Sequence, residues 1–147
     1  MNDDGDQPRI LISDRQSMRI AHDGLIALAR RCLVAEGLTR CELSVSFVGR
    51  EEMSELHATY LDEEVPTDVL SFPLDEQDVD EYGVRILGDV VIAPEVAAAN
   101  NPADPAAELR LLLVHGILHL LGYDHEGEQE RAAMWARQDR YTRERVR

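Results

Sequence analysis

The segment between Asp104 and Gly122 constrains the fold more than any other part of the chain. Asp104 can accept a hydrogen bond at a helix N-terminus, Pro105 suits the first helical position, and Gly122 can end a helix in the left-handed conformation. The residues between them are apolar on almost every side, with His115 and His119 placed among them. We therefore expect a helix that is buried between other elements.

The histidines of this segment have the spacing of metal ligands. His115 and His119 are four residues apart, so on a helix their Cβ atoms lie about 5–6 Å from each other on one face. A turn at Gly122 can bring His125 to the same ion. Three neutral imidazoles leave a tetrahedral zinc ion one open position for water, which is typical of catalytic sites. The sequence predicts one catalytic metal ion, most simply zinc, bound by His115, His119 and His125.

The same spacing, with glycine at the seventh position after the first histidine, occurs in the metzincin pattern HExxHxxGxxH. In those peptidases the glutamate is the general base, and here Gly116 takes its place. A peptidase of this kind would lack the carboxylate that activates its water. The alternative that these are ordinary core histidines is weakened because three of the five histidines fall within eleven residues. We expect the other two, His22 and His57, at the surface or its boundary.

Length and composition predict one domain. The 147 residues suffice for a single hydrophobic core. The polar, acidic residues 1–8 predict a disordered leader, and they lack the features of a secretory signal. No apolar run reaches the roughly 20 residues of a membrane-spanning helix, so we expect a cytoplasmic protein. Cys32 and Cys41 are expected as reduced, small core residues.

Periodicity predicts an α+β domain over residues 9–147, with a small sheet of about four strands and about five helices. The expected strands are 9–13, 40–48, 67–72 and 87–93, and the expected helices are 17–36, 51–61, 94–100, 105–121 and 128–144. On the last helix we expect Met134 and Trp135 to anchor the inner face.

Charge is unevenly distributed along the chain, whose net charge is −14. Between Asp62 and Glu95 there are eleven acidic residues and one basic residue, Arg85, whereas residues 131–147 hold six arginines and two acids. Nucleic-acid-binding proteins usually present a basic face. The arginine-rich C-terminal helix is therefore either a phosphate-binding surface or simply a solvated one, and the sequence leaves both open.

Three motifs together resemble one known family. They are PTDVLSFP at 66–73, LGDVVIAPE at 87–95 and HGILHLLGYDH at 115–125. In this order and spacing they resemble the YbeY family of bacterial endoribonucleases, also called rRNA maturation factors. The resemblance implies a zincin-like α+β fold, with a mixed sheet flanked by helices and the 66–73 strand lining a zinc cleft. It also identifies His115, His119 and His125 with the zinc ligands.

The resemblance further implies an activity and partners. It implies a metal-dependent, single-strand-specific endoribonuclease that acts in 16S rRNA 3′-end maturation and ribosome quality control. The partners would be single-stranded rRNA and the small ribosomal subunit with its assembly factors. A zinc ion would polarise a phosphate oxygen and lower the pKa of the attacking water or hydroxyl. A rival interpretation is a non-catalytic assembly factor in which zinc only stabilises the fold.

The chain departs from the family at one position. Many members carry an arginine after the aromatic residue that precedes the 66–73 motif, but here Tyr60 is followed by Leu61. Leucine cannot stabilise the negative charge of a phosphorane. Arg85 or an arginine within 131–147 is the candidate to replace it. The alternatives are that the metal ion supplies more of the charge stabilisation or that the reaction is slow.

Carboxylates near the histidines are candidates for proton transfer. Asp124 and Glu126 flank His125 and could serve as general base or hold a ligand in place, or could be solvated turn residues. Asp68 and Ser71 are weaker candidates to line the cleft.

Overall fold

The computed structural model describes residues 7–59, 69–74, 79–123 and 127–143. These residues form an α+β domain, as the sequence predicts. In chain order the elements are β1 (Arg9–Arg15), α1 (His22–Ala35), β2 (Cys41–Val48), α2 (Arg50–Thr59), β3 (Val69–Pro73), β4 (Arg85–Ile92), α3 (Pro94–Asn100), α4 (Pro105–Leu120) and α5 (Glu128–Arg143).

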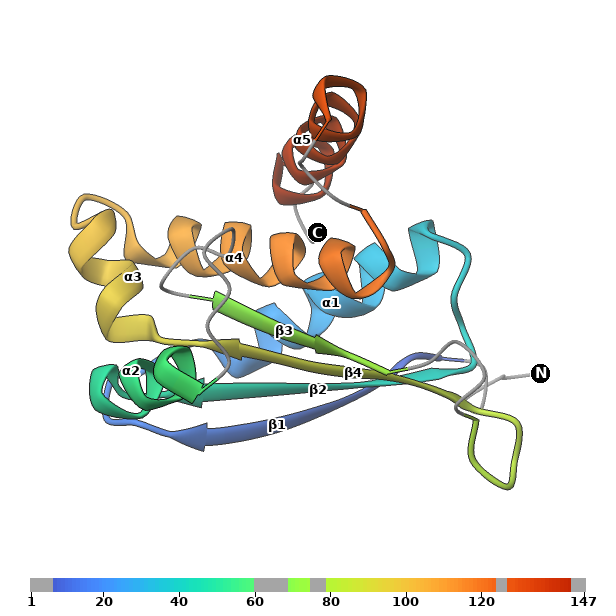
Figure 1. The fold of residues 1–147 in the computed structure, drawn as a ribbon, viewed down its shortest axis with the longest axis horizontal. Helices are drawn as coiled ribbons and strands as arrows, with labels where there is room; N and C mark the ends of the chain where they lie inside the picture. Colours follow the sequence, from blue (N-terminus) through green and yellow to red (C-terminus); the bar gives the residue numbers. More distant parts are fainter. Residues whose placement is uncertain (1–6, 60–68, 75–78, 124–126, 144–147) are drawn as a thin grey trace.

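The sheet is small and mixed, in the strand order β1-β2-β4-β3 (Figure 1). β1 and β4 run parallel to β2 on either side of it, and β3 pairs antiparallel with β4 at the edge. Parallel neighbours need a crossover connection, and α1 supplies it between β1 and β2. The antiparallel edge strand places the end of the 66–73 motif beside β4.

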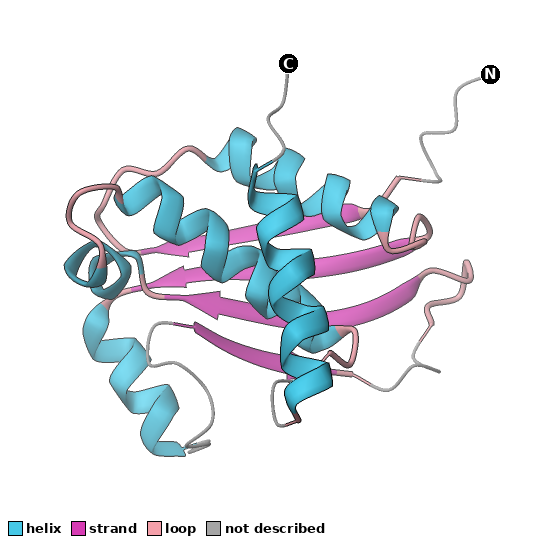
Figure 2. Cartoon of the chain, turned by 90° about the horizontal axis from the view of Figure 1, so that it is seen from above, coloured by secondary structure: helices cyan, strands magenta, loops and turns pink. Residues whose placement is uncertain are grey.

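Helices α1 and α4 cover one face of the sheet, and α5 crosses the outer side of α4 (Figures 1 and 2). Because side chains alternate along a strand, Val90 and Ile92 of β4 point into the main core under these helices. Val91 points the other way, into a smaller cluster with Met53 of α2. As expected, α4 is buried over most of its surface, and Asp104 caps it by accepting a hydrogen bond from the Ala107 amide at 3.1 Å.

Hydrogen bonds explain why α1 and β4 begin at other residues than the sequence predicts. Helix α1 starts at His22 instead of Ser17. The Gln16 side chain donates to the carbonyl of Met18 at 2.8 Å and accepts from its amide at 2.9 Å. Such local bonds satisfy the backbone without a helix. Strand β4 begins at Arg85, two residues early, because its backbone amide donates to the carbonyl of Arg40 next to β2.

The N-terminal prediction lies partly outside the described residues. Residues 1–6 of the predicted leader are not described, whereas Pro8 is buried and its carbonyl accepts a hydrogen bond from Arg30 at 3.0 Å. Cys32 and Cys41 are both buried free thiols, which confirms them as core residues. Within the described part of the chain, every helix is too short or too polar to cross a bilayer.

The inner face of α5 differs from the prediction in one residue. Met134 is fully buried, as expected, but the expectation for Trp135 was wrong, since 46% of this residue is exposed. The buried residues of α5 are Met134, Gln138 and Tyr141, which follow helical spacing. Trp135 is one residue, or about 100° around the helix, away from this stripe. Although the side chain is large and apolar, it therefore points only partly toward the core.

Gly116 permits a close approach of α4 to the sheet. A Cβ atom at this position would lie 2.6 Å from Cγ1 and 3.2 Å from Cγ2 of Val90, and 3.3 Å from Oγ of Ser71. Ser71 Oγ also donates a hydrogen bond to the Gly116 carbonyl at 3.1 Å. The helix therefore contacts β3 and β4 at a distance that only glycine allows.

We predict that Gly116→Ala lowers the free energy of unfolding by about 2–3 kcal/mol, because the added methyl group overpacks the contact with Val90. Gly24 of α1 is the matched control, since no atom lies within 4 Å of its Cβ position. Gly24→Ala is expected to raise stability by up to about 1 kcal/mol through helix propensity alone. Urea unfolding of the two variants measures both effects.

The Val90→Ala background separates a steric cause from a general loss of packing. In this background the additional cost of Gly116→Ala is expected to fall sharply, because the clashing methyl groups are gone. An equal cost in both backgrounds would contradict the close approach.

Candidate metal centre

His115 and His119 lie side by side on the C-terminal half of α4. Their ring centroids are 4.9 Å apart and the ring planes meet at 63°. His115 is only 7% exposed, and His119 is half-buried. The predicted spacing therefore brings two imidazoles together in a largely water-free position.

Gln138 of α5 contacts one ring nitrogen of His115. Its Oε1 lies 2.5 Å from His115 Nδ1, and both side chains are buried. With Gln138 Oε1 as the acceptor, this hydrogen bond forms in the tautomer that carries the proton on Nδ1 and the lone pair on Nε2. Metal-binding histidines are typically held in this way, with the second ring nitrogen donating to a protein oxygen. His115 can thus offer the lone pair that a zinc ligand requires, and His119 lies beside it.

The contact at Gly116 explains why α4 carries no glutamate between its histidines. A side chain there would point at Val90 and Ser71 in the sheet. No carboxylate fits in that space, so the peptidase alternative fails on packing as well as on sequence. Ser71 lies beside the histidine helix, through its bond to the Gly116 carbonyl.

Several predicted site residues lie outside the described part of the chain. They are the third predicted ligand His125, the candidate carboxylates Asp124, Glu126 and Asp68, and Leu61 at the position of the family arginine. Their roles stay predictions.

A cluster around Glu36 holds the turn that follows α4. Gly122 has a φ of +100° and ends the helix as expected. The next residue, Tyr123, donates its hydroxyl to Glu36 Oε1 at 2.8 Å. Glu36 Oε2 accepts from the Tyr141 hydroxyl and from Arg137 Nη1, the latter at 3.3 Å. A single buried carboxylate therefore ties α1, α5 and the turn together.

Arg85 lies near this turn and far from Gly116. Together with Glu36, Leu38, Leu121, Gly122 and Tyr123, it lines a hollow of about 300 Å³. Its backbone begins β4, five residues before Val90, a separation of roughly 17 Å along a strand. Arg85 is thus placed beside the residues that lead out of α4, and its catalytic role stays a prediction.

The sequence profile of the family described as Endoribonuclease YbeY matches residues 10–145. The chain belongs to this family. An Endoribonuclease YbeY from Salinispora tropica is 40% identical over 144 residues, covering 89% of this chain and 92% of the relative. The Streptomyces coelicolor relative is 39% identical over 138 residues, covering 86% and 84%. The Mycobacterium tuberculosis relative is 37% identical over 145 residues, covering 92% and 82%.

A solved structure supports the same fold for this YbeY-family chain. The solution structure of a Thermotoga maritima protein has a TM-score of 0.55 and 30% sequence identity, covering 92% of this chain and 86% of the other. The family resemblance drawn from the three motifs is confirmed, and with it the mixed-sheet α+β fold.

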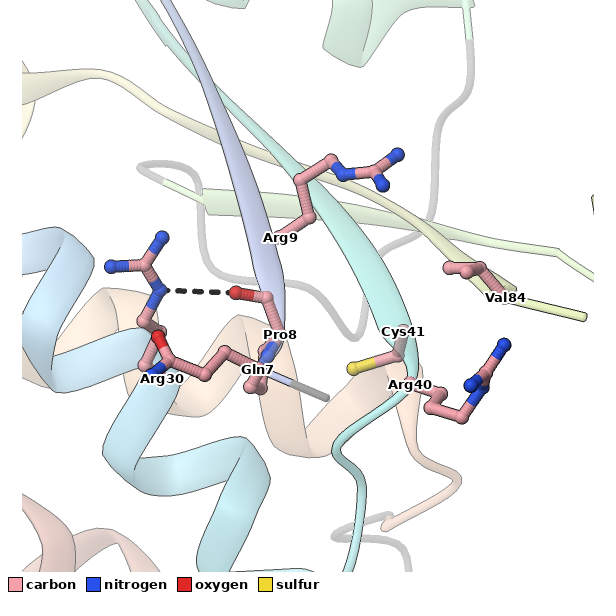
Figure 3. Close-up of a pocket in the computed structure, with 7 residues that line it drawn as sticks. All are labelled: Gln7, Pro8, Arg9, Arg30, Arg40, Cys41 and Val84. Carbon is pink, nitrogen blue, oxygen red and sulfur yellow. Dashed lines mark hydrogen bonds between the residues drawn. The ribbon is translucent and has the colours of Figure 1, made fainter. Parts of the chain in front are cut away.

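A second group of basic residues in this YbeY-family chain lies at the start of β1 and β2. Arg9, Arg30 and Arg40 line a hollow of about 280 Å³ around the buried Cys41. Figure 3 shows their guanidinium groups directed away from one another. Arg9 pairs with Glu42 at 3.0 Å. Because the three groups do not converge, the hollow is not a site for one phosphate.

Sequence reasoning missed Gln138 and Glu36. Gln138 is a polar residue on the buried stripe of α5, four residues after Met134. Glu36 directly follows α1, four residues after the buried Cys32. A polar residue at a position spaced like a core residue was the one sign in the sequence that each makes a buried polar contact. The partner of each residue lies far along the chain, 23 residues away for His115 and 105 for Tyr141, so local patterns could not name it.

The Glu36 cluster makes stability sensitive to alkaline pH. Burial, with the hydrogen bond to Glu36, raises the pKa of Tyr141 to about 12, against about 10 in an unfolded chain. The folded state therefore holds the proton more tightly. The resulting stabilisation is fully present below pH 10 and is lost as pH rises through 12.

We predict that Tyr141→Phe removes about 2 kcal/mol of stability near neutral pH, since a hydrogen bond to a charged group is lost. Between pH 10 and 12 the melting temperature of this variant should fall less steeply than that of the wild type. Thermal unfolding across this range measures both. Parallel curves for the two proteins would contradict the placement of the Tyr141 hydroxyl.

Proposed function

We propose that this chain is a zinc-dependent endoribonuclease that cleaves single-stranded RNA. Its proposed role is 16S rRNA 3′-end maturation and ribosome quality control in the cytoplasm, with the small ribosomal subunit and its assembly factors as partners. The observation that carries the proposal is the pair of adjacent imidazoles on α4, of which the buried one, His115, contacts Gln138. Membership of the Endoribonuclease YbeY family supports the choice of RNA as substrate.

The donor set favours zinc. Two neutral imidazoles at His115 and His119, with His125 as the proposed third ligand, match the nitrogen ligands of catalytic zinc sites. When bound, zinc supplies a Lewis acid for a phosphate oxygen and lowers the pKa of water. One ion is expected per chain.

The chain's own residues do the positioning. Gln138 keeps the His115 proton on Nδ1, so that Nε2 offers its lone pair. The contact of Gly116 with Val90 holds α4 rigidly against the sheet, and rigid ligands lose little entropy when they bind. Since no carboxylate fits at position 116 between the two histidines, we propose that proton transfer falls to Asp124 or Glu126.

We predict that the purified protein contains about one zinc per chain and that His119→Ala contains almost none. The matched control is His22→Ala. His22 lies far along the chain from α4, and its ring pairs with Asp14 at 2.7 Å. Elemental analysis of the three proteins decides the assignment. A full zinc content in His119→Ala would refute it.

The same proteins separate the enzyme from a non-catalytic assembly factor. Zinc-loaded wild type and His22→Ala should cleave a single-stranded RNA with the sequence of the 16S 3′ end, and His119→Ala should not. Zinc binding without cleavage by any of them would favour the assembly factor, in which zinc serves only folding.

We predict that Gln138→Leu weakens zinc binding by about 10- to 100-fold, the usual cost of removing the partner of a histidine ligand. Leucine has a similar volume but cannot accept a hydrogen bond from the Nδ1–H group of His115. Gln138→Glu should retain binding, because a carboxylate oxygen also accepts. Competition with a chromophoric chelator measures the affinities.

Two further measurements test the cause. Nitrogen NMR of the His115 ring should show the Nδ1-protonated form in wild type and a mixture in Gln138→Leu. Melting of the metal-free proteins checks that packing is retained. Equal zinc affinities in all three proteins would show that Gln138 is only a core residue.

A further inference from the structure

Trp135 combines exposure with closeness to the histidine pair. Nearly half of it is exposed, yet its ring centroid lies 6.1 Å from that of His115, with the planes at 61°. Tryptophan is enriched at binding interfaces, because its ring is apolar and its N–H can reach a polar partner. This one contacts a proposed metal ligand on one side and solvent on the other.

The indole forms one wall of a hollow. Leu111 of α4 and five residues of α5 line a space of about 460 Å³, within the range of about 300–1,000 Å³ of small-molecule sites. The α5 residues are Trp135, Ala136, Gln138, Asp139 and Thr142. Apolar walls from Trp135 and Leu111 are thus combined with polar groups from Asp139 and Thr142. A flat ring with polar edges, such as a nucleobase, suits this combination.

Charges around the hollow do not oppose RNA. The Asp139 carboxylate is paired with Arg143 Nε at 2.9 Å. Arg131 is four residues before Trp135 and therefore lies on the same side of α5, where it is exposed. The chain as a whole carries a net charge of −14, so phosphate contacts alone would give weak RNA binding. Aromatic stacking supplies affinity that does not depend on net charge.

We propose that Trp135 and this hollow form a stacking subsite that holds one unpaired nucleobase of the RNA beside the metal centre. The inference rests on the proposed function for its substrate. Single-stranded RNA is recognised mainly by stacking its unstacked bases on aromatic side chains. A base held on Trp135 places the neighbouring phosphate near His115, and a duplex cannot present its bases in this way.

The chain contains one tryptophan, so its fluorescence reports on this site alone. Zinc-loaded protein is titrated with a short single-stranded pyrimidine RNA and with an abasic ribose-phosphate oligomer of equal length. The first should quench the fluorescence and the second should not, because both carry the same charge and only the first has bases. Equal quenching by the two oligomers, or none by either, would overturn the proposal.

Variants test the energetic contribution. Trp135→Ala should weaken RNA binding by about 10- to 100-fold, and Trp135→Phe by less, since phenylalanine also stacks. Tyr82→Ala is the control, because Tyr82 is 72% exposed in the turn before β4. It should bind RNA as the wild type does. Anisotropy of a labelled RNA measures the affinities, and unchanged affinity in Trp135→Ala would overturn the subsite.

Two outcomes distinguish this inference from the proposed function. Base-dependent quenching in a protein that binds no zinc or cleaves nothing would support the subsite and refute the zinc-dependent nuclease. Zinc-dependent cleavage with an unchanged KM in Trp135→Ala would leave the nuclease standing and overturn the subsite. Loss of self-association in Trp135→Ala, seen by sedimentation, would assign the hollow to a second copy of the chain instead.

Discussion

The contact between Gly116 and the sheet sets the distance between α4 and strands β3 and β4, and with it the position of the side chains on α4. The helix lies so close to Val90 and Ser71 that no side chain fits between them. His115 and His119 flank this contact and are therefore held at a constant height above β3 and β4. The same constraint removes the glutamate of the metzincin pattern. This one packing interaction positions the two histidines and also excludes the glutamate base of the metzincin peptidases.

Helix α5 completes the site from the other side. Its buried stripe places Gln138 against His115, and the next face places Trp135 beside the same imidazole. One helix therefore contacts a proposed ligand and carries the proposed stacking surface. The Glu36 cluster holds α5 and the turn at Tyr123 to the end of α1, so the parts of the site cannot shift independently.

Electrostatics gives this protein little general attraction for RNA. Several described arginines are engaged locally: Arg9 with Glu42, Arg15 with Glu52, and Arg143 with Asp139. The arginines around Cys41 point apart (Figure 3). With a net charge of −14, long-range attraction to a polyanion is weak, which is why the proposed stacking contact at Trp135 matters for the proposed function.

The sequence alone determined most of the elements, the α+β class, the family and the pairing of His115 with His119. The elements and the histidine pair depend on spacing within one segment, and the family depends on the order of three motifs along the chain. Periodicity located α4 and its burial, and helical geometry placed the two histidines on one face. It did not assign Trp135 correctly, because size and hydrophobicity do not give direction when neighbouring residues compete for the core. Only the tertiary structure paired Gln138 with His115, joined Glu36 to Tyr141, and gave Gly116 its reason. Those contacts join segments that only the packing of the helices and the sheet brings together. A local sequence pattern does not specify which distant residue a side chain will contact.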